Sequence, residues 1–239
     1  MIKLVQLIKK FGAFTAVDGL NVEIAAGEFY GFLGPNGAGK TTTIKMMTGL
    51  FSPSAGSIVI NGHDLKHEPI QAKMSTGYVP DQPFLYEKLT GREFLYFSAG
   101  LYNVQHAAAT QRIKELAELF EIGSWIDRRT ENYSQGMRQR IVICAALLHN
   151  PKVLIIDEPM VGLDPRSVHI IKETLKRKAE EGVSIFMSTH SLAVAEELCH
   201  RVGIIKEGRL VFEDTIETLH LFKQGYDGKF ESLFLELTK

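Results

Sequence analysis

One stretch of eight residues, 34–41, constrains the fold of this chain more than any other. It reads Gly34, Pro35, Asn36, Gly37, Ala38, Gly39, Lys40 and Thr41, and it matches the phosphate-binding pattern GxxxxGK[ST] in full. The segment 28–33 before it, which has no charged residue after Glu28, predicts a buried strand, and residues 42–47 after it predict the first turns of a helix. Strand, glycine-rich loop and helix follow in the order that a phosphate loop requires. The alternative, a glycine-rich turn without a ligand, explains the match poorly.

The residue types of this loop suit a polyphosphate. Glycines adopt positive φ, so the backbone closes on the anion and several N–H groups point at it together with the helix N-terminus. We expect Lys40, a catalytic candidate, to reach the β- and γ-phosphates and the Thr41 hydroxyl to ligate Mg²⁺. The nucleotide-binding candidates of this segment are Gly34, Pro35, Asn36, Gly37, Ala38, Gly39, Lys40, Thr41 and Thr42.

Two later strands also end in residues that carry chemistry. The apolar run 153–156 ends in Asp157 and Glu158, two carboxylates that repel each other unless a cation lies near them. Asp157 would bind Mg²⁺ and Glu158 would polarise the attacking water, whereas a solvated strand end is the simpler alternative. His190 follows the buried run 183–189 and would donate a hydrogen bond to a γ-phosphate, although a lone histidine is more often structural.

A third predicted strand, 75–82, is stopped by Pro80 and leaves two polar residues at its end. Asp81 and Gln82 lie where the edge of a parallel sheet presents ligating groups, so they are candidates for contact with the metal or with the attacking water. They also suit an ordinary turn, and the local pattern does not separate the two interpretations.

Between residues 84 and 150 only the helical period occurs. Leu95, Phe97 and Leu101 mark one helix, and apolar residues at positions 113, 116, 117 and 120 mark another. We therefore predict an inserted helical subdomain, 84–150, within an α/β core formed by 1–83 and 151–239. Ser134 precedes a helix that ends before Pro151, either as a plain N-cap or as a second phosphate site at a helix N-terminus.

The remaining segments complete an α/β pattern. Segments 2–8 and 21–24 predict antiparallel strands with turns at 11–12 and 18–19, and residues 207–208 predict a hairpin. Asp164 with Pro165 predicts the start of a helix that runs to Gly182. The apolar residues after Asp214 predict a small helical end packed on the core. Phe11 precedes a glycine and would either stack on a purine or pack in the core.

Composition limits the partners and the compartment. Among 239 residues, 27 Lys and Arg oppose 28 Asp and Glu, so a net charge of −1 gives no electrostatic footprint for nucleic acid. Cys144 and Cys199 lie in apolar helical contexts and predict buried free thiols in a reducing compartment. The apolar run 141–148 is far below a membrane span of ~20 residues. We expect a cytoplasmic chain that reaches a membrane only through a partner.

These segments, in this order, resemble the nucleotide-binding subunit of an ATP-binding cassette (ABC) transporter over nearly the whole chain. Residues 34–41 match its Walker A motif, and 153–158 match its Walker B motif with the catalytic glutamate. Residues 133–137 occupy the place of the LSGGQ signature, 162–164 resemble the D-loop, and 188–190 resemble the switch histidine. The resemblance implies a P-loop NTPase (RecA-like) core with an N-terminal antiparallel β subdomain and an inserted helical subdomain.

The resemblance also implies a dimer that binds ATP and Mg²⁺. Two cassettes, as a homodimer or with a close paralogue, would stack head to tail, so that each signature helix caps the γ-phosphate held by the other. An integral membrane permease would be the second partner, on the cytoplasmic face of the membrane. Phe11 falls at the position of the adenine-stacking aromatic. The nucleotide contacts that the resemblance adds are Phe11, Val17, Ser134, Gln135, Gly136 and Asp164.

Two departures from the family pattern stand out. The signature has Gln135 and Met137 where the consensus has Gly and Gln, whereas Ser134 and Gly136 are kept. The Q-loop glutamine aligns with Asp81, and a glutamine follows at Gln82; we favour Asp81 because the preceding strand fixes the register. The chain length after the core is similar to that of short exporter cassettes. A soluble cassette ATPase without a transport role, or a regulatory module without turnover, is the alternative.

Overall fold

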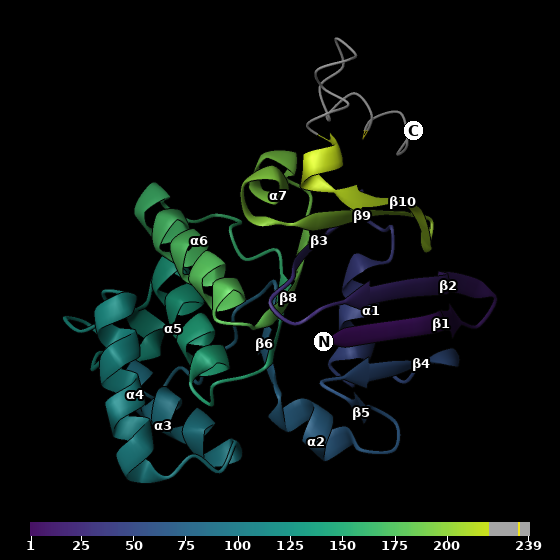
Figure 1. Ribbon diagram of the computed structural model, residues 1–239. Coiled ribbons are helices and arrows are strands. Elements are labelled where there is room, and N and C mark those ends of the chain that lie inside the picture. Colours follow the sequence, from purple (N-terminus) through teal and green to yellow (C-terminus); the bar gives the residue numbers. More distant parts are fainter. Residues whose placement is uncertain (220–233, 235–239) are drawn as a thin grey trace.

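The computed structural model describes residues 1–219 and residue 234. The strands are β1 Ile2–Phe11, β2 Phe14–Ile24, β3 Phe29–Leu33, β4 Ala55–Ile60, β5 His63–Asp64, β6 Thr76–Val79, β7 Val153–Asp157, β8 Ser184–Thr189, β9 Arg201–Lys206 and β10 Arg209–Thr215. The helices are α1 Lys40–Met47, α2 Pro69–Met74, α3 Gly91–Leu101, α4 His106–Leu119, the 3₁₀ turn η1 Thr130–Asn132, α5 Gln135–Leu147, α6 Pro165–Glu180 and α7 Leu192–Leu198. Figure 1 shows the strands grouped in two sheets, with α3, α4 and α5 on the side away from β1, β2 and β4.

The central sheet has the strand order β10-β9-β3-β8-β7-β6. Its inner strands are parallel, and β10 runs antiparallel to β9. Leu33 at the end of β3 pairs with Thr189 of β8, and Asp157 at the end of β7 pairs with Ser188. The carboxyl ends of β3, β8, β7 and β6 therefore lie along one edge of the sheet, where ligands of open α/β sheets bind.

Both faces of this sheet are buried, and alternate residues of each strand serve different cores. In β3, Phe29 and Leu33 pack with the helices α3 to α7, whereas Tyr30 and Phe32 pack against the antiparallel sheet and α1. All of these side chains are fully buried. Continuous apolar strands such as β3 and β7 are what a sheet covered on both faces requires.

The second sheet is antiparallel, with the order β2-β1-β4-β5. The predicted turn at residues 18–19 is wrong, because β2 continues through it. The pairing places Leu7 opposite Leu20 and Lys9 opposite Val17, so residues 18 and 19 together face Ile8. This is a β-bulge, in which one extra residue bends the strand without ending it, and a glycine with φ of 68° suits it. β1 and β2 therefore form a single hairpin.

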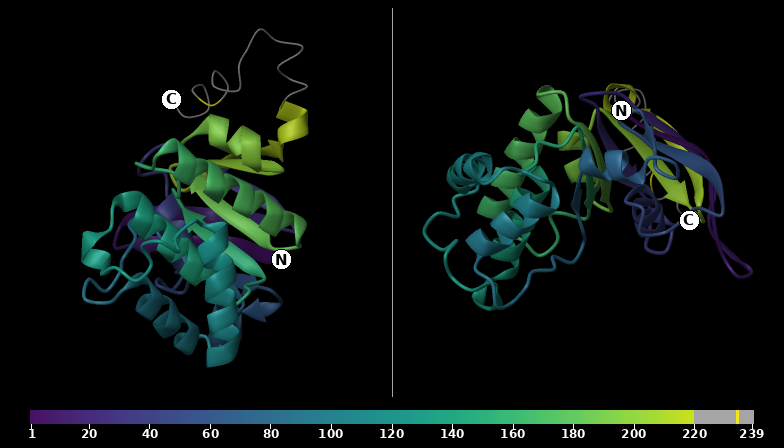
Figure 2. Two further views of the ribbon diagram at one scale, coloured as in Figure 1. Left: turned by 90° about the vertical axis from the view of Figure 1, so that its left-hand side faces the viewer. Right: turned by 90° about the horizontal axis from the view of Figure 1, so that it is seen from below.

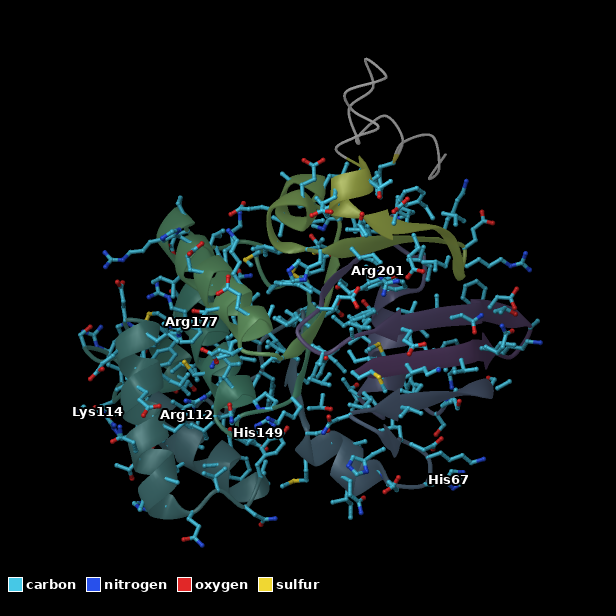
Figure 3. The ribbon with its side chains drawn as sticks, in the orientation of Figure 1. His67, Arg112, Lys114, His149, Arg177 and Arg201 are labelled. Carbon is cyan, nitrogen blue, oxygen red and sulfur yellow. The ribbon has the colours of Figure 1, made fainter. Side chains whose placement is uncertain are left out.

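The segment 84–150 contains only helices, as its period predicts, and Figure 2 shows them gathered at one end of the molecule. Only one of the three residues that mark α3 faces the core: Leu95 is buried, whereas Phe97 and Leu101 are 44% and 64% exposed. His149, at the end of this segment, stacks on Tyr102 with ring centroids 3.6 Å apart. Its Nε2 lies 3.2 Å from the Thr76 carbonyl, so it joins the helices to β6. Figure 3 labels His149 among the side chains of the molecule.

Other expectations concern single features. Cys144 and Cys199 are buried free thiols, and the hairpin at 207–208 joins β9 to β10. The predicted helical tail after Asp214 falls mostly on residues 220–233 and 235–239, outside the described residues. Among the described residues, no helix has the length and apolar character to cross a bilayer.

Candidate functional site

The phosphate loop lies tightly against two neighbouring strands. A Cβ on Gly34 would lie 2.4 Å from the Ile205 carbonyl oxygen, and one on Gly39 would lie 2.6 Å from that of Ala16. Gly39 also has a φ of 111°, which residues other than glycine rarely adopt. Any other residue at these two positions would push the loop away from β9 and β2. Gly39 is the N-cap of α1 and offers no side-chain acceptor, so the first N–H groups of the helix are left for a ligand.

Lys40 bends back over the loop that precedes it. Its Nζ donates to the carbonyl oxygens of Gly34 at 2.7 Å and Pro35 at 3.2 Å, and the side chain is buried. Burial lowers the pKa of Lys40, and the charges of Glu158 and Asp157 oppose that shift. The cation is thus held inside the loop, where a polyphosphate would be cradled.

Glu158 lies between Lys40 and His190. Its Oε1 is 4.0 Å from Lys40 Nζ, and its Oε2 is 2.9 Å from His190 Nδ1. The backbone of Glu158 has a φ of 48°, which is uncommon outside glycine, and its N–H donates to the Ser188 carbonyl at 3.3 Å. Strained backbone of this kind persists only where the surroundings hold it, and it clusters at functional sites.

Asp157 is 1% exposed and only partly satisfied. Its Oδ1 accepts a hydrogen bond from Ser188 Oγ, whereas Oδ2 is buried without a partner among the described residues. Burial raises the pKa of Asp157, and the nearby charge of Asp81 adds to the rise, whereas the hydroxyl groups of Ser188 and Thr41 oppose it. A buried carboxylate oxygen without a partner suits a cation, because unpaired buried charge is costly.

Asp81 and Gln82 occupy the loop after β6, and both are exposed. The backbone N–H of Gln82 donates to Asp81 Oδ1 at 2.8 Å, so the two residues form a local turn. Asp81 also acts on its surroundings through charge: burial, Asp157 and Asp81 together raise the pKa of Tyr78 to about 12. Of this pair, only Asp81 carries a charge, and that charge raises the pKa of Asp157.

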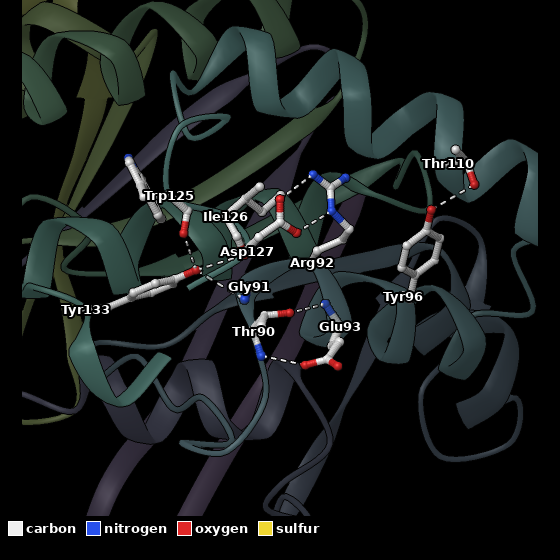
Figure 4. A network of polar contacts seen from close by, with 10 residues as sticks. All are labelled: Thr90, Gly91, Arg92, Glu93, Tyr96, Thr110, Trp125, Ile126, Asp127 and Tyr133. Atoms are coloured by element: carbon white, nitrogen blue, oxygen red, sulfur yellow. Dashed lines mark hydrogen bonds and ion pairs between the residues drawn. The ribbon is translucent and has the colours of Figure 1, made fainter. Parts of the chain in front are cut away.

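The start of α5 is built separately from the phosphate loop. Ser134 Oγ accepts a hydrogen bond from the Met137 N–H at 3.3 Å, as an N-cap does. Tyr133 fixes the preceding backbone, since its hydroxyl donates to Ile126 O and accepts from Gly91 N, each at 3.1 Å (Figure 4). Within the described part of the chain, no hydrogen bond or ion pair joins Ser134 to the phosphate loop.

Gln135, Gly136 and Asp164 meet at one place. Gln135 Nε2 donates to the Val161 carbonyl at 3.1 Å, and a Cβ on Gly136 would lie 3.2 Å from Asp164 Oδ2. Asp164 caps α6 by accepting from the Ser167 N–H at 3.0 Å. The segments that resemble the signature and the D-loop are thus in contact within one subunit.

Phe11 and Val17 lie on the hairpin of β1 and β2 at different depths. Phe11 is 45% exposed and packs edge to face on Phe51, with centroids 5.6 Å apart, and Lys9 Nζ lies over its ring, 5.0 Å from the centroid. Val17 is fully buried, and its Cγ2 lies 3.5 Å from the place of a Cβ on Gly39. Val17 therefore supports the phosphate loop from beneath.

Ser188 is a site residue that the sequence analysis did not assign a role. Its hydroxyl donates to Asp157, its Oγ accepts from the Glu158 N–H at 3.2 Å, and it is fully buried. It positions both carboxylates. A serine directly after the three apolar residues 185–187 of a buried strand was the available signal, since buried polar groups are almost always hydrogen-bonded.

Comparison with known proteins gives consistent results at the sequence level. The family model described as ABC transporter matches residues 17–161. The linearmycin resistance ATP-binding protein LnrL of Bacillus subtilis is 39% identical over 211 residues, which cover 88% of this chain and 68% of that protein. The Nod factor export ATP-binding protein I of Paraburkholderia xenovorans is 38% identical over 219 residues, or 92% and 72% of the two chains.

Solved structures agree. A structure described as the ATP-binding subunit of an ABC transporter has a TM-score of 0.92 and 33% identity, and each chain is covered in full. The cassette MJ0796, solved as a dimer in a post-hydrolysis state with ADP and Pi, has a TM-score of 0.81 and 25% identity over 90% of this chain and 99% of that one.

Proposed function

The chain belongs to the ABC transporter family, and from that premise we propose which of its residues carry ATP binding, hydrolysis and coupling to transport. It is an ATP-binding, ATP-hydrolysing cassette of that family. The observation that carries the assignment of roles is the convergence of Lys40, Asp157, Glu158 and His190 beside one phosphate loop.

Nucleotide binding is assigned to the loop and to the hairpin above it. The loop N–H groups and the uncapped start of α1 hold the phosphates, with Lys40 leaving the carbonyls of Gly34 and Pro35 to reach the β- and γ-phosphates. The accessible ring of Phe11 stacks on the adenine. Val17 keeps the loop in place.

Hydrolysis is assigned to Glu158 and His190. Glu158 accepts a proton from the attacking water, and His190 orients the carboxylate and donates to the γ-phosphate. Lys40 stabilises the charge that develops on the phosphoryl oxygens. No other described carboxylate lies as close to Lys40, so Glu158 is the base that the geometry favours.

Mg²⁺ would be held by Asp157, by Thr41 and by the loop at Asp81 and Gln82. The described residues contain no cluster of three or more carboxylate, histidine or cysteine ligands, which suits a Mg²⁺ ion held by one or two carboxylates together with substrate phosphates. The unpartnered Oδ2 of Asp157 supports this assignment. When bound, the ion would neutralise charge on the β- and γ-phosphates.

The second half of the nucleotide cage would come from another copy or a close paralogue. Ser134 and Gly136 lie at a helix start that no hydrogen bond or ion pair among the described residues joins to the phosphate loop, which supports binding of a γ-phosphate across a dimer. Gln135 would donate its backbone N–H to that phosphate, while its side chain contacts Val161. Asp164 lies beside this helix start. We assign 84–150 as the unit that carries this cap and 1–83 with 151–239 as the ATPase core.

An exposed aromatic cluster follows the Asp81 loop and supports a contact with a membrane subunit. Phe84, Tyr86 and Phe97 are 71%, 47% and 44% exposed, and Tyr86 makes T-shaped contacts with Phe84 and Phe97, with centroids 5.5 and 5.4 Å apart. Exposed apolar clusters of this kind mark interaction sites. We assign it to an apolar segment of an integral permease, which would hold the chain at the cytoplasmic face of the membrane. The export and resistance names of the relatives favour export.

Two experiments test these assignments. Glu158→Gln keeps the shape of the side chain and removes the base, so it should bind ATP and accumulate as an ATP-bound dimer in size-exclusion chromatography; monomer alone would contradict the proposal. Phe84→Ser with Phe97→Ser should abolish co-purification with the membrane subunit, whereas Phe14→Ser, which is 64% exposed on the far hairpin, should not. Unchanged co-purification of the double variant would exclude this cluster as the contact with the membrane subunit.

A further inference from the structure

Gln135 makes a contact that a glycine at this position could not make. Its Nε2 donates to the Val161 carbonyl at 3.1 Å, and its amide lies over Gly162, where an added Cβ would be only 3.0 Å from Nε2. The family signature has glycine here, as noted above. The departure from that signature therefore provides a side chain that holds the loop between β7 and α6.

The contacted loop begins at the catalytic carboxylate. Val161 N–H lies 3.5 Å from the Glu158 carbonyl, so residues 158–161 form a short turn. Glu158 stands at its first position with a left-handed φ of 48°, and its side chain lies between Lys40 and His190. A displacement of Val161 is thus transmitted to Glu158, three residues earlier in the chain, through a turn whose backbone is already constrained.

The same helix also holds the far end of this loop. Arg140 Nη2 donates to Ser167 Oγ at 2.8 Å, and the Ser167 N–H donates to Asp164 Oδ1 at 3.0 Å. Gly136 lets α5 approach Asp164 and Ser167, since a Cβ there would be 3.2 Å from both side chains. The start of α5 is therefore attached to the loop on both sides of Gly162.

We propose that Gln135 is a positioning residue that couples the start of α5 to Glu158 of the same subunit. The inference rests on the proposed function, in which that helix start binds the γ-phosphate of the opposite site. Phosphate bound at one site then sets the position of the base at the other, through Gln135 and Val161. In a dimer of two identical copies, the same contact runs from each site to the other, so ATP bound at either site positions the base of the other site.

Mixed dimers separate this role from a direct phosphate contact. The parent dimer pairs an intact copy with a Glu158→Gln copy, so only the site with the intact Glu158 turns over. In the first arm, Gln135→Ala is placed in the copy with intact Glu158; in the second, it is placed in the Glu158→Gln copy, whose helix caps the active site. Two affinity tags isolate each mixed dimer.

We expect turnover in the first arm to fall threefold to tenfold, roughly the effect of one lost hydrogen bond. The second arm should stay within about twofold of the parent, because alanine keeps the backbone N–H that is assigned to the γ-phosphate and removes only the side-chain contact with Val161. Gln111→Ala in the active copy is the matched control, because Gln111 donates to Glu115 within α4 at 3.0 Å, away from the loop. Gln135→Glu, which keeps the length of the side chain and loses the donor, should repeat the loss.

Loss confined to the second arm, equal loss in both arms, or no loss in either would overturn the coupling role. Turnover by the parent dimer tests the proposed function separately, and its absence would overturn both. Thermal unfolding of each variant should match that of the unmodified chain. If Gln135→Ala unfolds at a lower temperature than the unmodified chain, the turnover of Gln135→Glu in the same two arms is compared instead, with the same outcomes supporting or overturning the proposal.

Discussion

His190 Nδ1 lies 2.9 Å from Glu158 Oε2, and this pair joins the ends of two parallel strands, β8 and β7. The other oxygen of Glu158 is 4.0 Å from Lys40 Nζ. The carboxylate is thus held between a lysine of the phosphate loop and a histidine that is 60% exposed. The exposure of His190 leaves it open to a γ-phosphate, which is the role that we propose for it.

His190→Ala should therefore slow hydrolysis more than it weakens binding. Loss of a positioned acid–base partner costs about 10²-fold or more in kcat, whereas the KM for ATP should change only a few-fold because the loop is untouched. Steady-state ATPase kinetics of the two proteins measure both constants. A variant with more than half of the original kcat would exclude His190 from the reaction.

Lys40→Ala should abolish productive nucleotide binding. The lysine is buried in the loop and its contacts with phosphate would be charge-assisted, so the Kd for ATP should rise by at least about 30-fold. Equilibrium binding of a fluorescent ATP analogue measures this. Lys45→Ala, at the other end of α1, is the control and should bind as the unmodified chain does. Unchanged hydrolysis in Lys40→Ala would break the assignment of the phosphate loop.

Asp157→Asn should stabilise the nucleotide-free chain while it removes Mg²⁺-dependent turnover. Burial raises the pKa of Asp157, so its ionised form destabilises the folded chain at pH 7, and the penalty disappears as the pH falls through the raised folded pKa toward the unfolded value of 3.8. The amide carries no charge and avoids this penalty. We expect Tm at pH 7 to rise by about 2–4 °C and ATPase activity to fall about 100-fold or more.

A lower Tm for Asp157→Asn at pH 7 would contradict the burial argument. Mg²⁺-dependent ATPase activity that is unchanged in Asp157→Asn, with the same Mg²⁺ concentration at half-maximal activity, would contradict the assignment of Asp157 to the ion. The Tm difference between the two proteins should also shrink at acid pH, because Asp157 becomes protonated there.

Acid sensitivity should depend on His149. Burial lowers its pKa from 6.5 to about 4, so unfolding takes up a proton between these values and stability falls as the pH decreases from 6.5 to 4. His149→Phe keeps the ring stacked on Tyr102 and removes this proton, which should flatten the decline by up to about 1.4 kcal/mol per pH unit. Urea unfolding at several pH values in this window measures the slope.

His106→Phe is the control for that measurement. His106 also stacks on a tyrosine, Tyr96, with centroids 4.9 Å apart, but it is exposed. Its variant should keep the acid dependence of the unmodified chain. Equal slopes for all three proteins would show that the buried histidine does not control acid stability.

The sequence predicted those features that depend on local pattern. The phosphate loop, the ends of β6, β7 and β8, and the caps at Ser134 and Asp164 all follow from strand runs and capping residues, and the structure has them in these places. Parallel strands then bring Asp157 and His190 to one edge. Pattern alone therefore located most of the candidate site.

Features that depend on tertiary contacts were missed. The bulge at residues 18–19 resembles a turn in sequence, because both use an Asp-Gly pair, and only pairing with β1 distinguishes them. The contact of Gln135 with Val161 joins residues 26 apart in sequence, and no periodicity encodes it. Phe97 points outward from α3 although it is apolar, because the core face of this helix is set by packing against α4 and α5.

The central claim is that ATP is held between the phosphate loop of one subunit and the start of α5 of another. The most direct test is a structure of the Glu158→Gln variant grown with Mg²⁺ and ATP. We predict a head-to-tail dimer in which Ser134 of the partner subunit lies within hydrogen-bond distance of a γ-phosphate oxygen. If every copy of Ser134 instead faces solvent, far from any nucleotide, the claim is contradicted.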